Sequence, residues 1–224
     1  FEALPQAEHL VMCMADTAGI STVPHALIME KDSLAYITKR VDRIFTKNNM
    51  QMLAMEDFCQ LDLRLTQDKY KGSYERCAKI IERYSSRKGL DMTELYLRLV
   101  FSFLVGNSDM HLKNFSLYSQ RKGYYSLTPG YDMISTALLM PEDTEELALT
   151  LNGKRRKIKR SDFEVAMNSC SLEKKIIDNL FSKFTKVAEK WLEFIDISFL
   201  PKEMKQQYKL IITRRYQSFF DAQI

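Results

Sequence analysis

The stretch FLVGNSDMHLKNFSLY, residues 103–118, brings several reactive side chains together where an apolar segment ends. Within six positions it contains an acid (Asp109), an imidazole (His111), an ammonium group (Lys113) and an amide (Asn114). Side chains that bind or react are often carried on loops next to a rigid element. This loop is therefore the first candidate for a functional site.

The spacing within this loop favours phosphoryl transfer. Asp109 and Asn114 are five positions apart, as are the Asp and Asn of the protein-kinase catalytic loop. Such a reaction needs one carboxylate near the attacking hydroxyl, and an amide and a second acid to hold Mg²⁺. Asp132, eighteen positions beyond Asn114, supplies the second acid. Lys113 could contact a phosphate, and His111 could hold the loop or the nucleotide. The same spacing also arises by chance, because Asp and Asn are common in loops. A loop with a purely structural role therefore remains an alternative interpretation.

The composition sets limits on the class of protein. The chain has 224 residues, and its 33 Lys and Arg against 29 Asp and Glu leave a net charge of +4, which is too small to indicate a nucleic-acid binder. The four cysteines form no C-x-x-C pair, so we expect reduced thiols rather than a zinc site or disulfides. No apolar run approaches the ~18 residues of a membrane span, and the first residues show no secretion signal. We therefore expect a cytoplasmic protein without a membrane partner.

The hydrophobic pattern predicts a small β-containing N-terminal part followed by a helical body. A helix over residues 6–18 precedes a β-hairpin with strands 25–30 and 33–41, and residues 46–52 are expected to be a polar connector. A second hairpin, with strands 114–119 and 124–129, carries the polar cluster, and a further strand starts at residue 146. The predicted helices of the body span residues 55–63, 73–85, 91–106, 172–194 and 202–220. We expect Asp91 with Glu94, and Ser161 with Glu164, to form capping boxes at helix starts.

Two segments, GNSDMHLKNFSLY and YSLTPGYDMIS, resemble the signature of the HipA family of serine/threonine kinases, which are toxins of bacterial toxin–antitoxin modules. That signature is G-x-x-D-x-H-x-K-N-x-S, followed after a β-hairpin by L-T-P-x-Y-D. PQAEHLVMCMADTAGI, LAYITKRVDR and LALTLNGK are similar to other segments of the family. The resemblance covers most of residues 4–165. The last two predicted helices are similar to the family only in their general character, without matching motifs.

The resemblance implies an α+β, mainly α, protein-kinase-like fold. Residues 1–45 would form a partial N-lobe with a hinge at 38–43, and residues 46–224 a large helical C-lobe. Within the C-lobe, residues 106–116 would be the catalytic loop and 127–135 the metal-binding segment.

The resemblance also implies a role for each residue of the loop. Asp109 would be the catalytic base, and Asn114 and Asp132 would coordinate Mg²⁺. His111 and Lys113 would line the phosphate side of ATP.

Outside the loop, the resemblance implies that the run TKRVDR lies under adenine, with the Lys39 carbonyl and the Val41 amide as backbone partners. The family usually carries Phe where this chain has Val41, but the expected contact is through the backbone. Glu8 would correspond to the helix glutamate that orients a nucleotide-binding lysine.

The function implied is that of an ATP-dependent protein serine/threonine kinase of the HipA toxin type. Its protein substrate would be an aminoacyl-tRNA synthetase or another translation protein, and its partner a HipB-like DNA-binding antitoxin. The seven glycines form no phosphate-binding motif, and the family's N-terminal phosphate loop and lysine have no counterpart before Glu8. These parts are truncated, supplied by a separate N-terminal subunit, or absent. A non-catalytic kinase-like module that docks an antitoxin or such a subunit is therefore the alternative.

Two other features receive simpler interpretations. The run GKRRKIKR, residues 153–160, places six cations in seven positions, and we expect a solvated loop rather than direct contact with nucleic acid. His9 and His25 belong to no carboxylate or cysteine pattern and are expected to be structural.

Overall fold

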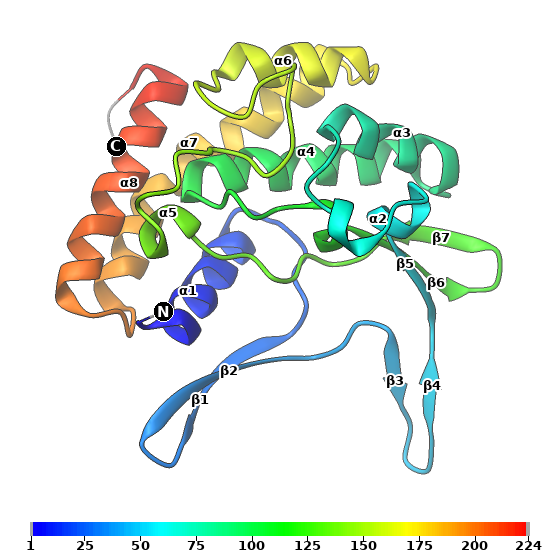
Figure 1. The fold of residues 1–224 in the computed structure, drawn as a ribbon, viewed down its shortest axis with the longest axis horizontal. Coiled ribbons are helices and arrows are strands. Elements are labelled where there is room, and N and C mark those ends of the chain that lie inside the picture. The colour runs from blue at the N-terminus through cyan, green and yellow to red at the C-terminus, as the bar shows by residue number, and fades with distance from the viewer. Residues whose placement is uncertain (1, 223–224) are drawn as a thin grey trace.

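The computed structural model describes residues 2–222, and Figure 1 shows a helical body from which two β-ribbons project on one side. The helices are α1 (Leu4–Thr17), α2 (Phe58–Leu61), α3 (Tyr74–Tyr84), α4 (Lys88–Val105), α5 (Thr136–Leu139), α6 (Arg160–Ser169), α7 (Lys174–Ile197) and α8 (Lys202–Phe220), with 3₁₀ turns η1 (Thr66–Asp68) and η2 (Leu112–Asn114). The strands are β1 (His25–Glu30), β2 (Ser33–Thr38), β3 (Arg43–Phe45), β4 (Met50–Met52), β5 (Ala54–Asp57), β6 (Ser116–Arg121) and β7 (Tyr124–Leu127). The predicted α+β, mainly α, class is confirmed.

The strands form three small antiparallel sheets. β1 and β2 make the first ribbon, β3 and β4 the second, and β5, β6 and β7 a three-stranded sheet on the helical body. The β1–β2 register pairs Glu30 with Ser33, so the turn lies at Lys31 and Asp32 as predicted. The β6–β7 hairpin, which follows the polar loop, is also confirmed.

Two predictions around residue 50 are wrong. Residues 46–52 are not simply a connector, because β3 and β4 pair there and Thr46 N–H donates to the Asn49 carbonyl at 2.9 Å. The polar residues are those of a hairpin turn, and strands of three residues are too short to show alternation. The helix expected over residues 55–63 begins as strand β5, which pairs with β6. Only after Asp57, whose carboxylate accepts a hydrogen bond from Gln60 N–H at 2.8 Å, does α2 start.

Both predicted capping boxes are also wrong. α4 starts at Lys88, and Asp91 lies buried in its first turn, where it accepts hydrogen bonds from Ser85 Oγ (2.6 Å) and the Leu127 amide (2.8 Å). This carboxylate ties the helix to its neighbours instead of capping it. At α6 the capping acid is Asp162, which accepts from the N-cap amide of Lys159 at 2.9 Å.

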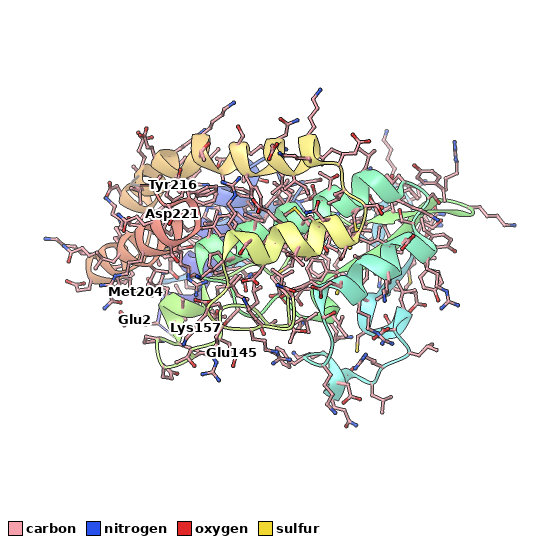
Figure 2. All side chains as sticks on the ribbon, turned by 90° about the horizontal axis from the view of Figure 1, so that it is seen from above. Glu2, Glu145, Lys157, Met204, Tyr216 and Asp221 are labelled. Carbon is pink, nitrogen blue, oxygen red and sulfur yellow. The ribbon has the colours of Figure 1, made fainter. Side chains whose placement is uncertain are left out.

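The segment between α5 and α6 is largely irregular, and Figure 2 labels Glu145 and Lys157 on it. The strand predicted from residue 146 is reduced to two isolated bridges, Ser73 with Thr150 and Leu151 with Lys154. The apolar side chains in this stretch are buried in the core rather than paired in a sheet.

A single hydrophobic core joins the first helix to the last ones. α4 is almost wholly buried, and α1, α7 and α8 pack against it. The indole Nε1 of Trp191 on α7 donates to the Met14 carbonyl (3.1 Å) and to Thr17 Oγ1 (3.0 Å) on α1. The division into residues 1–45 and 46–224 stays a prediction. No helix among residues 2–222 combines the length and apolar character that a membrane span needs.

Candidate functional site

The polar loop starts where α4 ends. Gly106 terminates the helix in the left-handed region, with φ of 78°, and the Asn107 amide donates back to the Ser102 carbonyl at 2.8 Å. The side-chain oxygen of Asn107 then accepts from the Asp109 amide at 3.0 Å. These bonds aim the loop out of the core at Asp109, which is the first partly exposed residue after α4.

The segment that carries Asp132 is fixed from several sides. Arg98, buried on α4, donates to the Thr128 carbonyl at 2.7 Å. Gly130 exchanges backbone hydrogen bonds with Ser21 (2.6 Å) and Val23 (2.9 Å) in the chain that leads into β1. Tyr131 OH donates to the Lys113 carbonyl at 3.1 Å.

Asn114 lies between the two acidic segments. Its Nδ2 donates to the Asp109 carbonyl at 3.0 Å and approaches the Asp132 carbonyl at 3.5 Å. Because the amide nitrogen is used in this way, Oδ1 is the atom left to bind a cation. The structure thus brings together the three residues that the sequence singled out.

The electrostatics of this cleft reflect several nearby acids. Loss of hydration and the neighbouring Asp109 raise the pKa of Asp132, although its side chain still reaches solvent. Burial, followed by the charge of Asp132, raises the pKa of Glu8 to about 7. Neighbouring carboxylates repel one another when both are ionised, and a bound cation relieves that repulsion. Together with an amide oxygen they supply the hard oxygen ligands that a divalent cation such as Mg²⁺ prefers.

His111 is buried beside Asp109. Burial lowers its pKa most strongly, the charge of Asp109 opposes that shift, and Lys69 adds to it. Its Nδ1 has no hydrogen-bond partner among the described residues. That nitrogen is buried, so a polar group of a ligand could reach it only if the ring turned.

Lys113 and the expected hinge have different surroundings. Lys113 Nζ lies 2.5 Å from Asp57 Oδ2, so in this structure its amino group is held by β5 rather than left free in the cleft. Lys39 and Val41 line a cavity of about 190 Å³ together with Met55 and Tyr131. Tyr131 directly precedes Asp132, so this cavity adjoins the acidic cleft.

A model of the family described as the HipA-like C-terminal domain matches residues 1–192. The chain belongs to this family. A curated protein of Sinorhizobium fredii named "Putative kinase Y4dM" is 27% identical over 188 residues, which are 79% of this chain and 45% of that protein. A "Putative kinase" of Haemophilus influenzae is 24% identical over 229 residues, 89% of this chain and 65% of that protein. The HipA-like chain thus spans less than two thirds of the length of these curated relatives.

Solved structures show the same fold. HipA of a toxin–antitoxin system of Shewanella oneidensis MR-1, determined with HipB and operator DNA, matches with a TM-score of 0.84 at 18% identity, over 99% of this chain and 57% of that one. The Helicobacter pylori proinflammatory kinase CtkA matches with a TM-score of 0.65 at 15% identity, over 97% of this chain and 84% of that one. The predicted family and the kinase-like fold are confirmed.

Two residues near the polar loop of the HipA-like chain were missed by sequence reasoning. Tyr70 OH donates to Asp109 Oδ1 at 2.5 Å, and the Tyr70 ring packs edge-on against His111 with centroids 5.0 Å apart. Arg155 donates to the Tyr70 carbonyl at 2.5 Å. Tyr70, Asp109 and Arg155 line a cavity of about 200 Å³, which also includes Ser108. No motif in the sequence marks Tyr70, because it meets Asp109 only through the tertiary fold.

The basic run 153–160 is largely occupied with local partners. Lys154 Nζ lies 2.8 Å from Asp162, Arg156 Nε 3.3 Å from Glu145, and Arg160 Nε 3.0 Å from Glu164. These pairs support the simpler interpretation of a structural, solvated loop.

The interpretation of His9 and His25 as isolated is wrong. The two imidazoles lie with centroids 5.5 Å apart, beside Cys13, and His25 Nε2 is 3.3 Å from Asp16 Oδ2. His9 and Cys13 are one helical turn apart, and the hairpin that starts at His25 folds back onto α1. The i, i+4 spacing of His9 and Cys13 was the available signal.

Proposed function

We propose that the chain carries the catalytic part of an ATP-dependent protein serine/threonine kinase of the HipA type. The convergence of Asp109, Asn114 and Asp132 on one cleft carries this proposal. Phosphoryl transfer brings an acceptor hydroxyl, a base and a divalent cation together in one cleft. The family and its fold make phosphoryl transfer the function that this cleft supports best.

Each residue of the cleft has a role in the proposal. Asp109 accepts the proton of the acceptor hydroxyl; its Oδ1 already accepts a hydrogen bond from a hydroxyl, that of Tyr70. Asn114 Oδ1 and the Asp132 carboxylate would hold Mg²⁺. When bound, the ion neutralises charge on the phosphates of ATP. The cavity beside Asp109 is open enough, at about 200 Å³, to admit an acceptor side chain.

The nucleotide would lie on the other side of the acids. The cavity lined by Lys39 and Val41 adjoins Tyr131 and suits an adenine ring held through backbone groups. His111 would lie on the phosphate side, where its buried and unpartnered Nδ1 could contact a phosphate if the ring turned. Lys113 can reach a phosphate only by giving up its ion pair with Asp57, so its contribution is expected to be smaller.

The partners proposed are a HipB-like DNA-binding antitoxin and a protein substrate from the translation machinery. The complex of the Shewanella HipA with HipB supports the first. A further β-containing segment, on the same or a separate polypeptide, would pack on the two ribbons. Large apolar side chains on them are exposed, including Met29 and Phe45 (each 65%) and Met52 (63%). We expect the protein to act in the cytoplasm.

Transfer of label from γ-labelled ATP tests the catalytic role of Asp109. The full-length protein, its Asp109→Asn variant and the control Asp178→Asn, on an exposed position of α7, are incubated with Mg²⁺ and protein extract. Loss of a general base lowers the rate by about 10²- to 10⁴-fold, so Asp109→Asn should lose nearly all transfer while the control keeps it. Equal incorporation by all three would remove Asp109 from the mechanism.

The second candidate function is a kinase-like module that binds without catalysis. The Tyr70 hydroxyl on Asp109 and the Asp57 carboxylate on Lys113 favour it, because both expected site groups are already paired within the chain. Calorimetry with ATP and Mg²⁺ separates the two functions. Micromolar binding that is lost in Asp132→Asn supports the kinase, whereas no binding by the full-length protein supports the module.

A further inference from the structure

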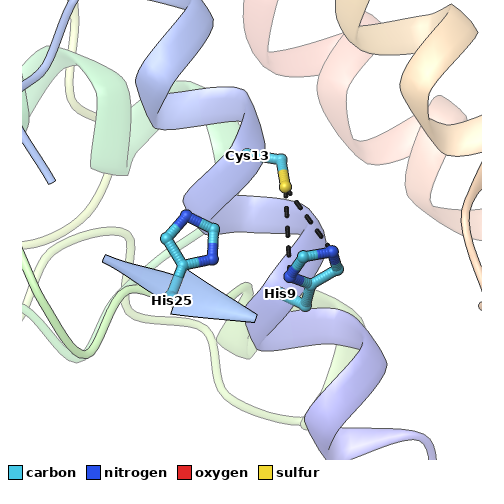
Figure 3. Close-up of side chains that lie close together, drawn as sticks. All are labelled: His9, Cys13 and His25. Atoms are coloured by element: carbon cyan, nitrogen blue, oxygen red, sulfur yellow. Dashed lines mark hydrogen bonds between the residues drawn. The ribbon is translucent and has the colours of Figure 1, made fainter. Parts of the chain in front are cut away.

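Three side chains of types that can bind metals meet between α1 and β1, outside the group of residues proposed for catalysis. Figure 3 shows His9 and Cys13 on successive turns of α1, with the His25 ring of β1 directed toward them. Cys13 Sγ lies 3.7 Å from His9 Nε2, and one possible ligand atom from each of the three residues lies within 4.8 Å of the other two. None of the three takes part in the function proposed above.

The separations are close to those of a tetrahedral zinc site. Zinc binds thiolate at ~2.3 Å and imidazole nitrogen at ~2.0–2.1 Å, so tetrahedral angles place sulfur and nitrogen ligands about 3.6 Å apart. The observed 3.7 Å between Cys13 Sγ and His9 Nε2 matches this separation, but Nδ1 is also only 4.0 Å from the sulfur, so the His9 ring must turn to direct one nitrogen at a shared ion. Because the helix fixes His9 and Cys13 one turn apart, rotation of the His9 and His25 rings would complete three ligands whose atoms already lie within 4.8 Å of one another.

His25 is oriented for such a role. Its Nε2 faces the Asp16 carboxylate at 3.3 Å, while its Nδ1 is buried and has no hydrogen-bond partner among the described residues. An imidazole that donates one N–H to a carboxylate and presents the other nitrogen to a metal is the usual arrangement around zinc. A buried nitrogen without a partner is costly, and a bound cation would satisfy it.

We propose that His9, Cys13 and His25 form a Zn²⁺ site, with Asp16 positioning His25. Thiolate and imidazole ligands select zinc over Mg²⁺ or Ca²⁺, which prefer oxygen. The fourth ligand would be water, because His9 and Cys13 also line an open cavity of about 250 Å³ against Phe194 and Phe199.

The site would join the β1–β2 ribbon to α1. Tyr36 of β2 packs on His25 with ring centroids 6.0 Å apart, and Glu8 precedes His9 on α1. The bound ion would therefore fix the ribbon at the edge of the acidic cleft. The proposal does not depend on kinase activity, because it concerns metal affinity and stability alone.

Titration of the metal-free chain with Zn²⁺, in competition with a chromophoric chelator, tests the site. The chain should bind one Zn²⁺ more tightly than the variants Cys13→Ser and His25→Gln by about 100-fold or more, and more tightly than Asp16→Asn by roughly 10- to 100-fold. Cys170→Ser, which removes a partly exposed thiol far along the chain, is the matched control and should bind as the unchanged chain does. Co²⁺ in place of Zn²⁺ should give a sulfur-to-metal charge-transfer band that Cys13→Ser abolishes.

Folding of each variant is checked without metal by circular dichroism and thermal unfolding. Zn²⁺ should then raise the Tm of the unchanged chain and of Cys170→Ser, but not that of Cys13→Ser, because only a bound ion stabilises the folded state. The proposal is overturned if no stoichiometric Zn²⁺ binds, if Cys13→Ser and Cys170→Ser bind equally, or if the Co²⁺ form lacks the sulfur band.

Discussion

At the scale of single residues, the contact between Tyr70 and Asp109 should affect how readily a protein substrate binds. The Tyr70 hydroxyl bonds to Oδ1 of the proposed base, which an acceptor hydroxyl would also need. A protein substrate must therefore displace Tyr70 from this atom. Burial, and then the bond to Asp109, raise the pKa of Tyr70, so the tyrosine stays a hydrogen-bond donor at neutral pH.

The variant Tyr70→Phe should bind its protein substrate more readily. A hydrogen bond contributes ~0.5–1.5 kcal/mol net, so we expect KM for the protein substrate to fall by about 2- to 10-fold with little change in kcat. Steady-state kinetics measure both, and Tyr124→Phe, on the exposed β6–β7 hairpin, is the control. A higher KM or a much lower kcat would mean that Tyr70 positions Asp109 instead of competing for it.

The sequence identified some of these residues and not others for a physical reason. Asp109, His111 and Asn114 are close in the chain, so their spacing is visible without a structure. Tyr70, in the turn after η1, and Glu8, on α1, reach the same cleft, and no local pattern records that approach. The pairing of Lys113 with Asp57, 56 positions away, was hidden in the same way.

At the scale of elements, the end of α4 depends on a glycine. Gly106 has φ of 78°, and a Cβ added there would lie 2.9 Å from Ala137 Cβ and 3.1 Å from Ser135 Oγ. Gly106→Ala should lower the free energy of unfolding by about 2–4 kcal/mol, because overpacking adds to backbone strain. Urea unfolding measures the change. Gly123→Ala, at φ of 77° with open space around it, should lose only about 1 kcal/mol. Equal losses would mean that packing at α5 is unimportant.

The start of α6 should give the chain a specific sensitivity to acid. Burial alone would raise the pKa of Asp162, but hydrogen bonds from Lys154, Asn152 and the Lys159 amide outweigh it, and the net pKa is lowered. A lowered pKa stabilises the fold above the unfolded value of about 3.9, and this stability is lost as pH falls through the folded pKa.

Asp162→Asn should therefore lower the free energy of unfolding at pH 7 by about 2 kcal/mol, with a smaller difference from the unchanged chain as pH falls below about 4. Chemical unfolding between pH 3 and pH 7 provides the comparison. Asp178→Asn, on an exposed position, should follow the unchanged chain throughout. A loss of stability that is constant with pH would contradict the charge-based explanation.

The sequence predicted most elements of the fold but placed their ends poorly. The periodicity of hydrophobic residues and the identity of the turn residues predicted two hairpins and four helices: β1–β2, β6–β7, α1, α3, α7 and α8. Asp91 looked like a cap because capping residues are also good partners in tertiary contacts, whereas Ser161 is exposed in the first turn of α6, whose N-cap is Lys159. β5 looked helical because its strand character comes from its partner β6, not from its own four residues.

At the scale of the whole molecule, the first helix is part of the same core as the last ones. Trp191 is fully buried, bonds to the end of α1, and packs edge-on against Phe101 of α4. α1 also buries Val11, Met12 and Ala15 completely. The division near residue 45 stays a prediction, but this shared packing leads us to expect that residues 1–45 and 46–224 unfold together.

A chain shortened to residues 46–224 should not fold cooperatively. It would expose the surfaces of α4 and α7 that α1 covers and leave the Trp191 indole without its acceptors. We expect a broad or absent thermal transition and a red-shifted tryptophan emission, compared with the sharp transition of residues 1–224. A transition of unchanged sharpness would show that residues 46–224 form an independent domain.

The backbone around Asp132 has a further consequence for control of the protein. Its left-handed conformation, φ of 56°, is held by the bonds of Thr128, Gly130 and Tyr131 to three separate parts of the fold. Swinging this acid outward would break several hydrogen bonds, each worth ~0.5–1.5 kcal/mol. An inactive state made by flipping this segment would thus be sparsely populated. We therefore expect any switching to act on side chains with fewer ties to the fold, such as Tyr70, rather than on this segment.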